Sequence, residues 1–242
     1  MSLLSRLLSK LRRTEKPILW PNGSTWCALK NEESFRTTDG PRYLWTIPCG
    51  QLELPSGRLV ACDPFAALRP NDNAFVQTHK GRFPVFVTLA VVSPAQDRSH
   101  IREAYASIVF SAENEAYRKT IPLARAGERR PETKDGEFVG FGVDAGTACF
   151  VDDCVIGRCM PDPMTWHEEV FDNQKPDSWF HRMDDPNHIR PGIANIILPL
   201  AQNGENLILF HSGWGDGVYP VVASFDSADR LVAMHIDFFV IR

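Results

Sequence analysis

The segment 231–241 has a period of two, in which every second side chain is apolar. This face consists of Val232, Met234, Ile236, Phe238 and Val240. Because successive side chains of a β-strand point to opposite faces of its sheet, the pattern predicts a strand whose apolar face lies in a hydrophobic core. The chain therefore has to build at least one sheet that is covered on this side.

Strand patterns also dominate the rest of the chain. Short apolar and β-branched runs occur at 58–62, 84–92, 101–110, 138–151, 193–200, 206–210 and 218–225. We expect the last three, together with 231–241, to form an antiparallel meander. A short helix is expected over 153–159 with Asp152 as its cap. The sequence thus predicts a mainly β fold (α+β), with antiparallel sheets that form a sandwich or an open barrel and few helices.

Composition and charge place the chain among soluble globular proteins. Its 242 residues are 43% hydrophobic and 23% charged, which is typical of one domain with a sizeable core. The formal net charge of −4 and the isoelectric point near 6.0 give no electrostatic reason to bind nucleic acid or anionic lipid. A basic protein is the partner that this charge favours.

The amino terminus has the pattern of an amphipathic helix. Leucines recur at helical spacing over residues 1–13, and Arg6 and Lys10 interrupt them. A secretory signal needs an unbroken apolar core, so we expect a cytoplasmic protein with no integral membrane segment. Two interpretations of this helix stay open: weak contact with a membrane surface, or packing on the domain.

Six cysteines lie at positions 27, 49, 62, 149, 154 and 159. Without an export signal, they are expected to be free thiols in a reducing compartment. The five-residue spacing of the last three does not match the short cysteine pairs of structural zinc sites. The sequence therefore predicts no metal and no cofactor.

The segment 160–190 carries the net charge of the chain. It has seven acidic residues against three Lys or Arg, a balance of −4 that equals the charge of the whole protein. Aromatic side chains are interleaved with the acids, and no strong periodicity is present, so we expect a long functional loop. Acids can steer a basic partner and aromatics can anchor it. The residues expected at this interface are Asp162, Trp166, Glu168, Glu169, Asp172, Asp177, Trp179, Asp184 and Asp185.

A second candidate site surrounds the glycine-rich stretch 211–220, in which glycine stands at 213, 215 and 217. Asp144, Asp216 and His211 could meet there as a carboxylate and imidazole cluster of a small hydrolase. The same features also suit a sharp turn, in which the side chain of Asp216 binds nearby backbone. The spacing matches no phosphate-binding loop, dinucleotide fingerprint or nucleophile elbow.

Three segments carry a resemblance to a known family. They are 52–64 (LELPSGRLVACDP), 143–152 (VDAGTACFVD) and 212–220 (SGWGDGVYP). The chain resembles, over residues 52–241, the bacterial family catalogued as domain of unknown function 4241. The resemblance implies a single β-rich domain over 52–242, preceded by an amino-terminal helix and extension over 1–51. It carries no activity that can be transferred, but it implies a genomic context of interbacterial toxins.

Charge and context together favour one function. We expect an immunity protein, antitoxin-like, that binds and neutralises a cognate toxin through the acidic segment. A nuclease is a suitable toxin because its substrate is polyanionic and its own surface is basic. The alternative is the small hydrolase that uses Asp144, Asp216 and His211.

Overall fold

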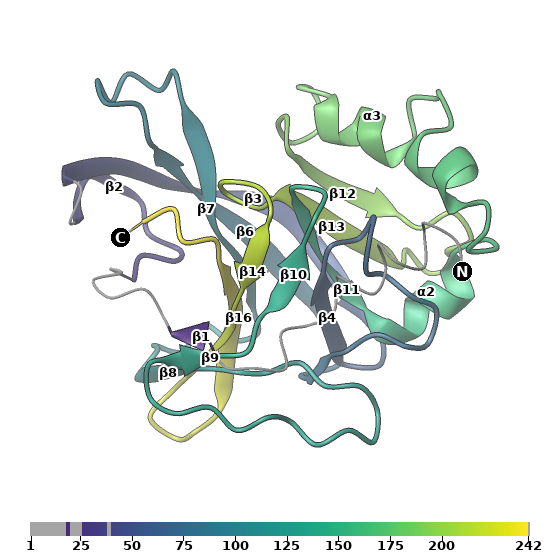
Figure 1. The fold of residues 1–242 in the computed structure, drawn as a ribbon, viewed down its shortest axis with the longest axis horizontal. Coiled ribbons are helices and arrows are strands. Elements are labelled where there is room, and N and C mark those ends of the chain that lie inside the picture. Colours follow the sequence, from purple (N-terminus) through teal and green to yellow (C-terminus); the bar gives the residue numbers. More distant parts are fainter. Residues whose placement is uncertain (1–17, 20–25, 38–39, 242) are drawn as a thin grey trace.

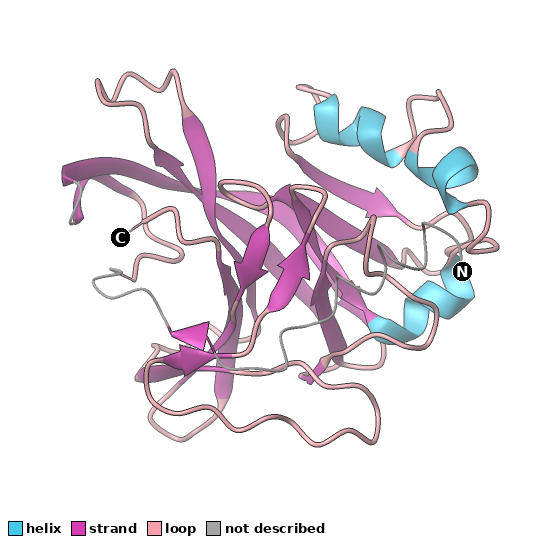
Figure 2. Cartoon of the chain, viewed as in Figure 1, coloured by secondary structure: helices cyan, strands magenta, loops and turns pink. Residues whose placement is uncertain are grey.

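The computed structural model describes residues 18–19, 26–37 and 40–241. The amphipathic helix expected over residues 1–13 lies outside the described residues. The fold is mainly β, with 42% strand and 9% helix, and all strand pairs between named strands of the described chain are antiparallel. Figures 1 and 2 show two sheets that face each other, with helices on one outer side. The predicted fold class is confirmed.

The larger sheet has seven strands and is strongly curled. In spatial order they are β2 (Glu32–Thr37), β3 (Gly40–Leu54), β6 (Gly81–Val91), β7 (Ile101–Val109), β16 (Leu231–Asp237), β15 (Val221–Phe225) and β8 (Tyr117–Thr120). Met234 and Ile236 of β16 point into the core, as their period of two predicts. Strand β3 runs across residue 52, so residues 40–51 belong to the same sheet as the strands that follow.

The smaller sheet has five strands, and its central strands are buried on both faces. The order is β12 (Ile193–Ile197), β13 (Asn206–His211), β11 (Thr147–Asp152), β4 (Arg58–Cys62) and β5 (Val76–Gln77). Phe150 and Phe210 pack into the core between the two sheets. Val151 and Leu209, their neighbours in sequence, pack into a second core on the opposite face. The sequences of these strands are therefore continuous apolar runs, without the alternation of apolar and polar residues that a half-exposed strand shows.

Two short ribbons complete the strands. β10 (Phe141–Val143) pairs with β14 (Gly217–Tyr219), and β1 (Ile18–Leu19) pairs with β9 (Glu137–Phe138). Phe141, Val143 and Tyr219 all join the core between the sheets. The β10–β14 ribbon thus contributes to the same core as the two large sheets.

Three short helices form the third layer. They are α2 (Asp153–Cys159), the π-helix η1 (His167–Phe171) and α3 (Trp179–Asp184). Their buried side chains share the second core with the outer face of the five-stranded sheet. The predicted helix at 153–159 is confirmed, and the Asp152 side chain caps it by accepting from the Cys154 N–H.

The predicted meander of the last four strands is wrong. β12 pairs with β13 and β15 pairs with β16, but the two hairpins lie in different sheets. The expected strand 218–225 is divided at Pro220 into β14 and β15, which pair with different partners. Proline cannot donate a ladder hydrogen bond, so the chain can leave one ribbon and enter the other sheet at this point.

The buried Asp63 carboxylate joins two distant turns. Its Oδ1 accepts from the N–H groups of Phe65 (2.9 Å) and Ala66 (3.2 Å), next to Asp63 in sequence. Its Oδ2 accepts from the N–H groups of Asp144 (2.9 Å) and Ala145 (2.7 Å), which belong to the turn between β10 and β11. Burial raises the pKa of this carboxyl group, although the four donors favour its charged form.

Replacing Asp63 tests this connection. The variant Asp63→Ala removes a buried carboxylate and leaves four N–H groups without their acceptor, so we expect it to lose about 2–4 kcal/mol of unfolding free energy in urea denaturation. Asp144→Ala is the matched control, because that side chain is exposed in the adjoining turn. Equal stability of the two variants would contradict the role given to Asp63.

A second buried carboxyl group, that of Asp237, has incomplete hydrogen bonding. Its Oδ1 accepts from the Phe239 N–H at 2.8 Å, while Oδ2 has no partner among the described residues. Burial raises the pKa of this group from 3.8 to about 7. The folded protein therefore holds a proton that the unfolded chain releases as the pH rises above the unfolded value.

This proton makes the effect of Asp237→Asn depend on pH. Wild-type stability falls as the pH rises from the unfolded to the folded pKa, because the folded carboxyl group resists ionisation. Asparagine does not titrate, so the stability of the variant relative to wild type should rise by about 1–3 kcal/mol between about pH 4 and about pH 8. Thermal unfolding at both pH values measures this change. The exposed Asp144→Asn should show no such trend, and a flat difference for Asp237→Asn would argue against the raised pKa.

Candidate functional site

The acidic segment is not the long loop that the sequence suggests. It contains η1 and α3, and Ser178 caps α3 by accepting from the His181 N–H at 3.3 Å. The helices are held by aromatic packing, with ring centroids 5.0 Å apart for Phe171 and Trp179 and 5.1 Å apart for Phe65 and Phe171. We call residues 162–185 the acidic helical layer.

The two tryptophans predicted as surface anchors lie in the core. Trp166 is 6% exposed and Trp179 is 1% exposed, and both pack in the second core under the helices. The Trp166 indole N–H donates to the Pro161 carbonyl at 2.9 Å, so its polar atom is also satisfied within the chain. Burying these large rings against the five-stranded sheet removes more apolar surface from water than a solvated loop could. A partner therefore cannot contact them in this conformation.

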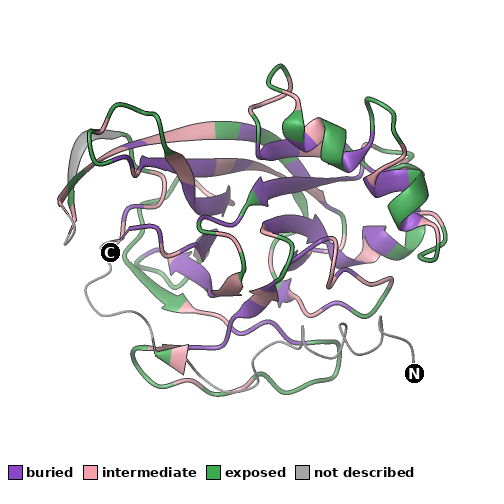
Figure 3. Cartoon of the chain, turned by 45° about the horizontal axis from the view of Figure 1, so that its top comes forward, coloured by how far each residue is buried: buried purple, intermediate pink, exposed green. Residues whose placement is uncertain are grey.

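The predicted acids, in contrast, stay at the surface. Asp162, Glu168, Glu169, Asp177 and Asp184 are exposed, and Asp172 and Asp185 are half-buried. Figure 3 shows that these helices are exposed on their outer side and buried toward the sheet. Two apolar side chains share this surface, Met164 at 89% exposure and Phe180 at 38%.

Four of these carboxylates form neither an ion pair nor a side-chain hydrogen bond with the described residues. Asp185 lies 4.0 Å from the Arg182 guanidinium, and Asp162 and Asp172 accept local hydrogen bonds. Among the predicted acids, those whose side chains form neither an ion pair nor a hydrogen bond with the described part of the chain are Glu168, Glu169, Asp177 and Asp184. The acidic helical layer thus presents unpaired negative charge on a fixed scaffold.

The proposed hydrolase residues lie around two adjoining turns. The Asp216 carboxylate accepts from the Gly146 N–H at 3.0 Å, and His211 is opposite Thr147 in the β11–β13 ladder. Among the described residues, no hydrogen bond joins the side chains of Asp144, Asp216 and His211. Asp216 thus binds the backbone of the other turn, 70 residues away in sequence, rather than the nearby backbone of its own turn.

His211 has a different set of charged neighbours. Burial lowers the pKa of its imidazole, which also responds to Asp184, Arg102 and Arg190. Arg190 forms an ion pair at 3.5 Å with the buried carboxylate of Glu103, whose pKa burial raises to about 7. Sequence reasoning missed Glu103, although a lone acid in the apolar strand 101–109 was a visible signal.

His235 and Asp237 share a strand face, but they do not form an acid and imidazole pair. The His235 ring nitrogens lie 2.8 Å from Ser107 Oγ and 3.0 Å from Ser224 Oγ. Burial lowers the pKa of His235 to about 3, so its imidazole is neutral at physiological pH. Trp26 covers it edge-on, with ring centroids 5.2 Å apart, and the imidazole is buried. Ser224 Oγ also donates to the carboxylate of Glu115, which is exposed.

The glycine-rich stretch is a tightly bonded turn. Ser212 Oγ donates to the Gly215 carbonyl at 2.7 Å, and the Ser212 N–H donates to the Gly146 carbonyl at 3.0 Å. Trp214 projects outward at 54% exposure and lies under the Arg102 guanidinium, whose carbon is 5.3 Å from the ring centroid. The turn therefore joins β13 to β14 and places one aromatic ring at the surface.

Two glycines of this turn give a matched pair of substitutions. Gly213 has a φ of +61°, and an added Cβ would lie 2.8 Å from Phe238 Cβ. Gly215 has a φ of +107°, with nothing within 4 Å of its added Cβ. We expect Gly213→Ala to cost about 3 kcal/mol, from strain and overlap, and Gly215→Ala about 1 kcal/mol, from strain alone. Urea denaturation of both variants checks the order, and a larger cost at Gly215 would contradict the packing described.

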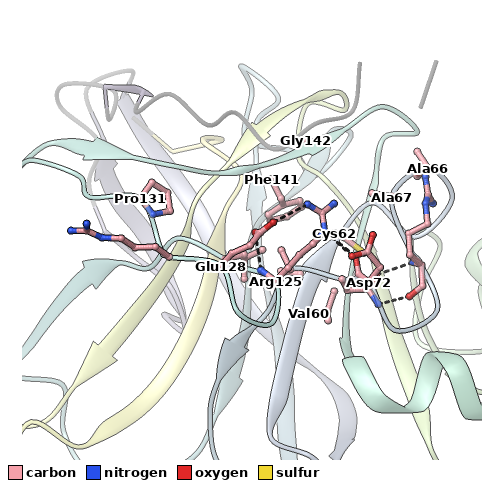
Figure 4. Close-up of a pocket in the computed structure, with 16 residues that line it drawn as sticks. Val60, Cys62, Ala66, Ala67, Asp72, Arg125, Glu128, Pro131, Phe141 and Gly142 are labelled. Atoms are coloured by element: carbon pink, nitrogen blue, oxygen red, sulfur yellow. Dashed lines mark hydrogen bonds and ion pairs between the residues drawn. The ribbon is translucent and has the colours of Figure 1, made fainter. Parts of the chain in front are cut away.

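A cleft of about 820 Å³ lies beside β4. Figure 4 shows Cys62, Arg125, Asp72 and Glu128 among its lining residues. The Arg125 guanidinium lies 3.1 Å from Asp72 and 3.5 Å from Glu128, so much of the charge at its edge is paired. This cleft could not be predicted from the sequence because its walls come from distant segments.

Metal-binding clusters and membrane-spanning helices are both absent from the described residues. No group of three or more His, Cys, Asp or Glu side chains is placed to hold a metal ion there. No helix in this part of the chain has the length and apolar character needed to cross a bilayer.

These features define a class: a three-layer β-sandwich whose helical layer carries exposed, unpaired acids. The sequence model of the family described as protein of unknown function (DUF4241) matches residues 52–236, and the chain belongs to this family. The predicted family is thus confirmed. Comparison with curated proteins and with solved structures finds no match.

Proposed function

We propose that this protein is a cytoplasmic immunity protein that binds a basic bacterial toxin through the acidic helical layer and neutralises it. The observation that carries the proposal is the exposure of Glu168, Glu169, Asp177 and Asp184 without an ion pair or side-chain hydrogen bond in the described chain. Unpaired surface carboxylates of one sign attract a cationic protein over several ångströms and speed its association.

The buried tryptophans support this role because they anchor the helices that carry the acids. Trp179 packs on Phe171 and on Phe65, so the acids stand on helices that are anchored to the five-stranded sheet. A fixed array of charges loses less conformational freedom on binding than charges on a mobile loop. The partner would meet carboxylates, with Met164 and Phe180 as the apolar contacts.

A nuclease is the kind of toxin that suits this surface. Enzymes that bind nucleic acid carry Lys and Arg where the phosphates lie. An acidic surface competes for the same groups and blocks access of the substrate. The immunity protein itself needs no contact with nucleic acid, in keeping with its net charge of −4.

The small hydrolase is the alternative, and it has less support. Asp216 binds the Gly146 N–H, and Asp144 is an exposed residue of the turn beside it. A general acid and base pair must lie within hydrogen-bond reach of its target, and His211 has its nearest charged groups elsewhere.

Charge reversal on the acidic helical layer tests the proposal. The variant Glu168→Lys/Glu169→Lys should bind the toxin at least about tenfold more weakly, because it replaces attraction by repulsion at the interface. The toxin is first identified by capture from lysate of the source bacterium and mass spectrometry, and its affinity is then measured by calorimetry. Both substitutions are at exposed positions, so thermal unfolding should be unchanged.

The matched control reverses two exposed acids on a different surface. Glu132→Lys/Asp135→Lys makes the same change of charge in the segment between β8 and β9, and it should retain wild-type affinity. The proposal fails if the wild-type protein captures no basic protein. It fails as well if the Glu168→Lys/Glu169→Lys variant captures the same basic protein as the wild type. It also fails if the two double variants weaken binding equally, since net charge alone would then explain the result.

A further inference from the structure

Two free cysteines face each other across the five-stranded sheet. Cys62 of β4 and Cys149 of β11 are direct partners in the antiparallel ladder, and both thiols are free. Their Sγ atoms are 3.8 Å apart. Directly opposed residues of antiparallel strands have Cα atoms about 4.5–5.5 Å apart, which lies within the range that a disulfide spans. Side-chain rotation is therefore enough to bring the two sulfur atoms to bonding distance.

The two thiols differ in their access to solvent. Cys149 is 0% exposed, whereas Cys62 is 8% exposed and lines the cleft described above. Figure 4 shows its place among the lining residues. Cys62 therefore borders the cleft, whereas Cys149 is not among its lining residues.

The charges around the cleft suggest what kind of molecule enters it. The charged residues that line it are Arg69, Arg125, Arg129, Asp72 and Glu128. The Arg69 guanidinium donates to the carbonyls of Leu68 (2.6 Å) and Ala66 (3.0 Å) and has no carboxylate partner among the described residues. Arg125 is paired with Asp72 and Glu128, and Arg129 is paired with Glu132. Arg69 therefore supplies the positive charge without a carboxylate partner at this cleft, and it favours an anionic molecule over a cationic one.

We propose that Cys62 and Cys149 are a redox-active pair that forms a reversible intramolecular disulfide by exchange with a small anionic disulfide bound in the cleft. Cys62 is the attacking thiol because it is the one that lines the cleft. Cys149 is the resolving thiol because it is directly opposite and shielded. This proposal does not rest on the proposed function, although both thiols lie in the second core beneath the helices.

The exchange proceeds in two balanced steps. Cys62 loses its proton to water, and its thiolate attacks one sulfur of the small disulfide; a mixed disulfide forms and one small thiolate leaves. Cys149, deprotonated in turn, attacks Cys62 Sγ; the protein disulfide forms and the second small thiolate leaves. The two protons end on the two small thiols. The protein pair is oxidised by two electrons, and the small disulfide is reduced by two.

The thiol environment makes the exchange slow. The contact with Cys149, together with burial, holds the pKa of the Cys62 thiol well above its usual value. The thiolate is the reactive form, so little of it is present at neutral pH. A test should therefore measure the product after long incubation of the folded protein rather than an initial rate.

The test uses oxidised glutathione, a disulfide that carries carboxylates. Folded wild-type protein is incubated with it, remaining thiols are alkylated, and intact mass and peptide maps are recorded. We expect the loss of two hydrogen atoms, a cross-link between the peptides that contain Cys62 and Cys149, and its complete reversal by dithiothreitol.

Single variants separate the two roles. Cys149→Ala should retain one glutathione on Cys62, because no resolving thiol remains. Cys62→Ala should form neither the cross-link nor an adduct at Cys149. The matched control Cys154→Ala removes a half-buried thiol of α2 and should behave as wild type. Circular dichroism confirms that each variant is folded.

Two results would overturn the proposal. One is that, after incubation of the folded wild-type protein, Cys62 and Cys149 are both still reduced and are fully alkylated. The other is that a cross-link forms but joins a different pair of cysteines. Both results come from wild-type protein, so they decide the question even if a variant fails to fold.

Discussion

The whole architecture depends on a five-stranded sheet that is covered on both faces. Alternate residues of β11 and β13 point to different cores, Phe150 and Phe210 toward the larger sheet and Val151 and Leu209 toward the helices. A sheet in this position needs a cover on each side, or it exposes an apolar face to water. The acidic helical layer is this cover. Its aromatic residues therefore fill the core, and its acidic residues lie on the outer side of the helices, which faces the solvent.

Carboxylates that accept backbone N–H groups hold the family motifs together. Asp63 binds the N–H groups of Asp144 and Ala145, and Asp216 binds that of Gly146. Asp152 accepts from the Ser56 and Gly57 N–H groups as well as capping α2. The three segments that carry the family resemblance thus bind one another. These aspartates therefore maintain turn geometry at both ends of the paired strands β4 and β11.

Local patterns in the sequence predicted local structure well. The period of two in 231–237 predicted β16, and Asp152 before an apolar run predicted the start of α2. Pairing between distant strands could not be predicted. For example, β13 is apolar on both faces, so its hydrophobic pattern does not indicate which strands lie beside it. The helices of 160–190 were missed because they are short and lie between prolines. For the candidate site, composition located the charge, but it could not show that Trp166 and Trp179 are buried.

The strand order also has a consequence for how the chain folds. β4 pairs with β11, and β7 pairs with β16, so each sheet joins segments that are far apart in sequence. Loops of this length must close before the pairings stabilise them, which makes folding slow. During synthesis the larger sheet cannot be completed until residue 237 has left the ribosome. Up to that moment the edge of β7 that pairs with β16 has no strand partner, and an unpaired edge of this kind favours aggregation of the nascent chain.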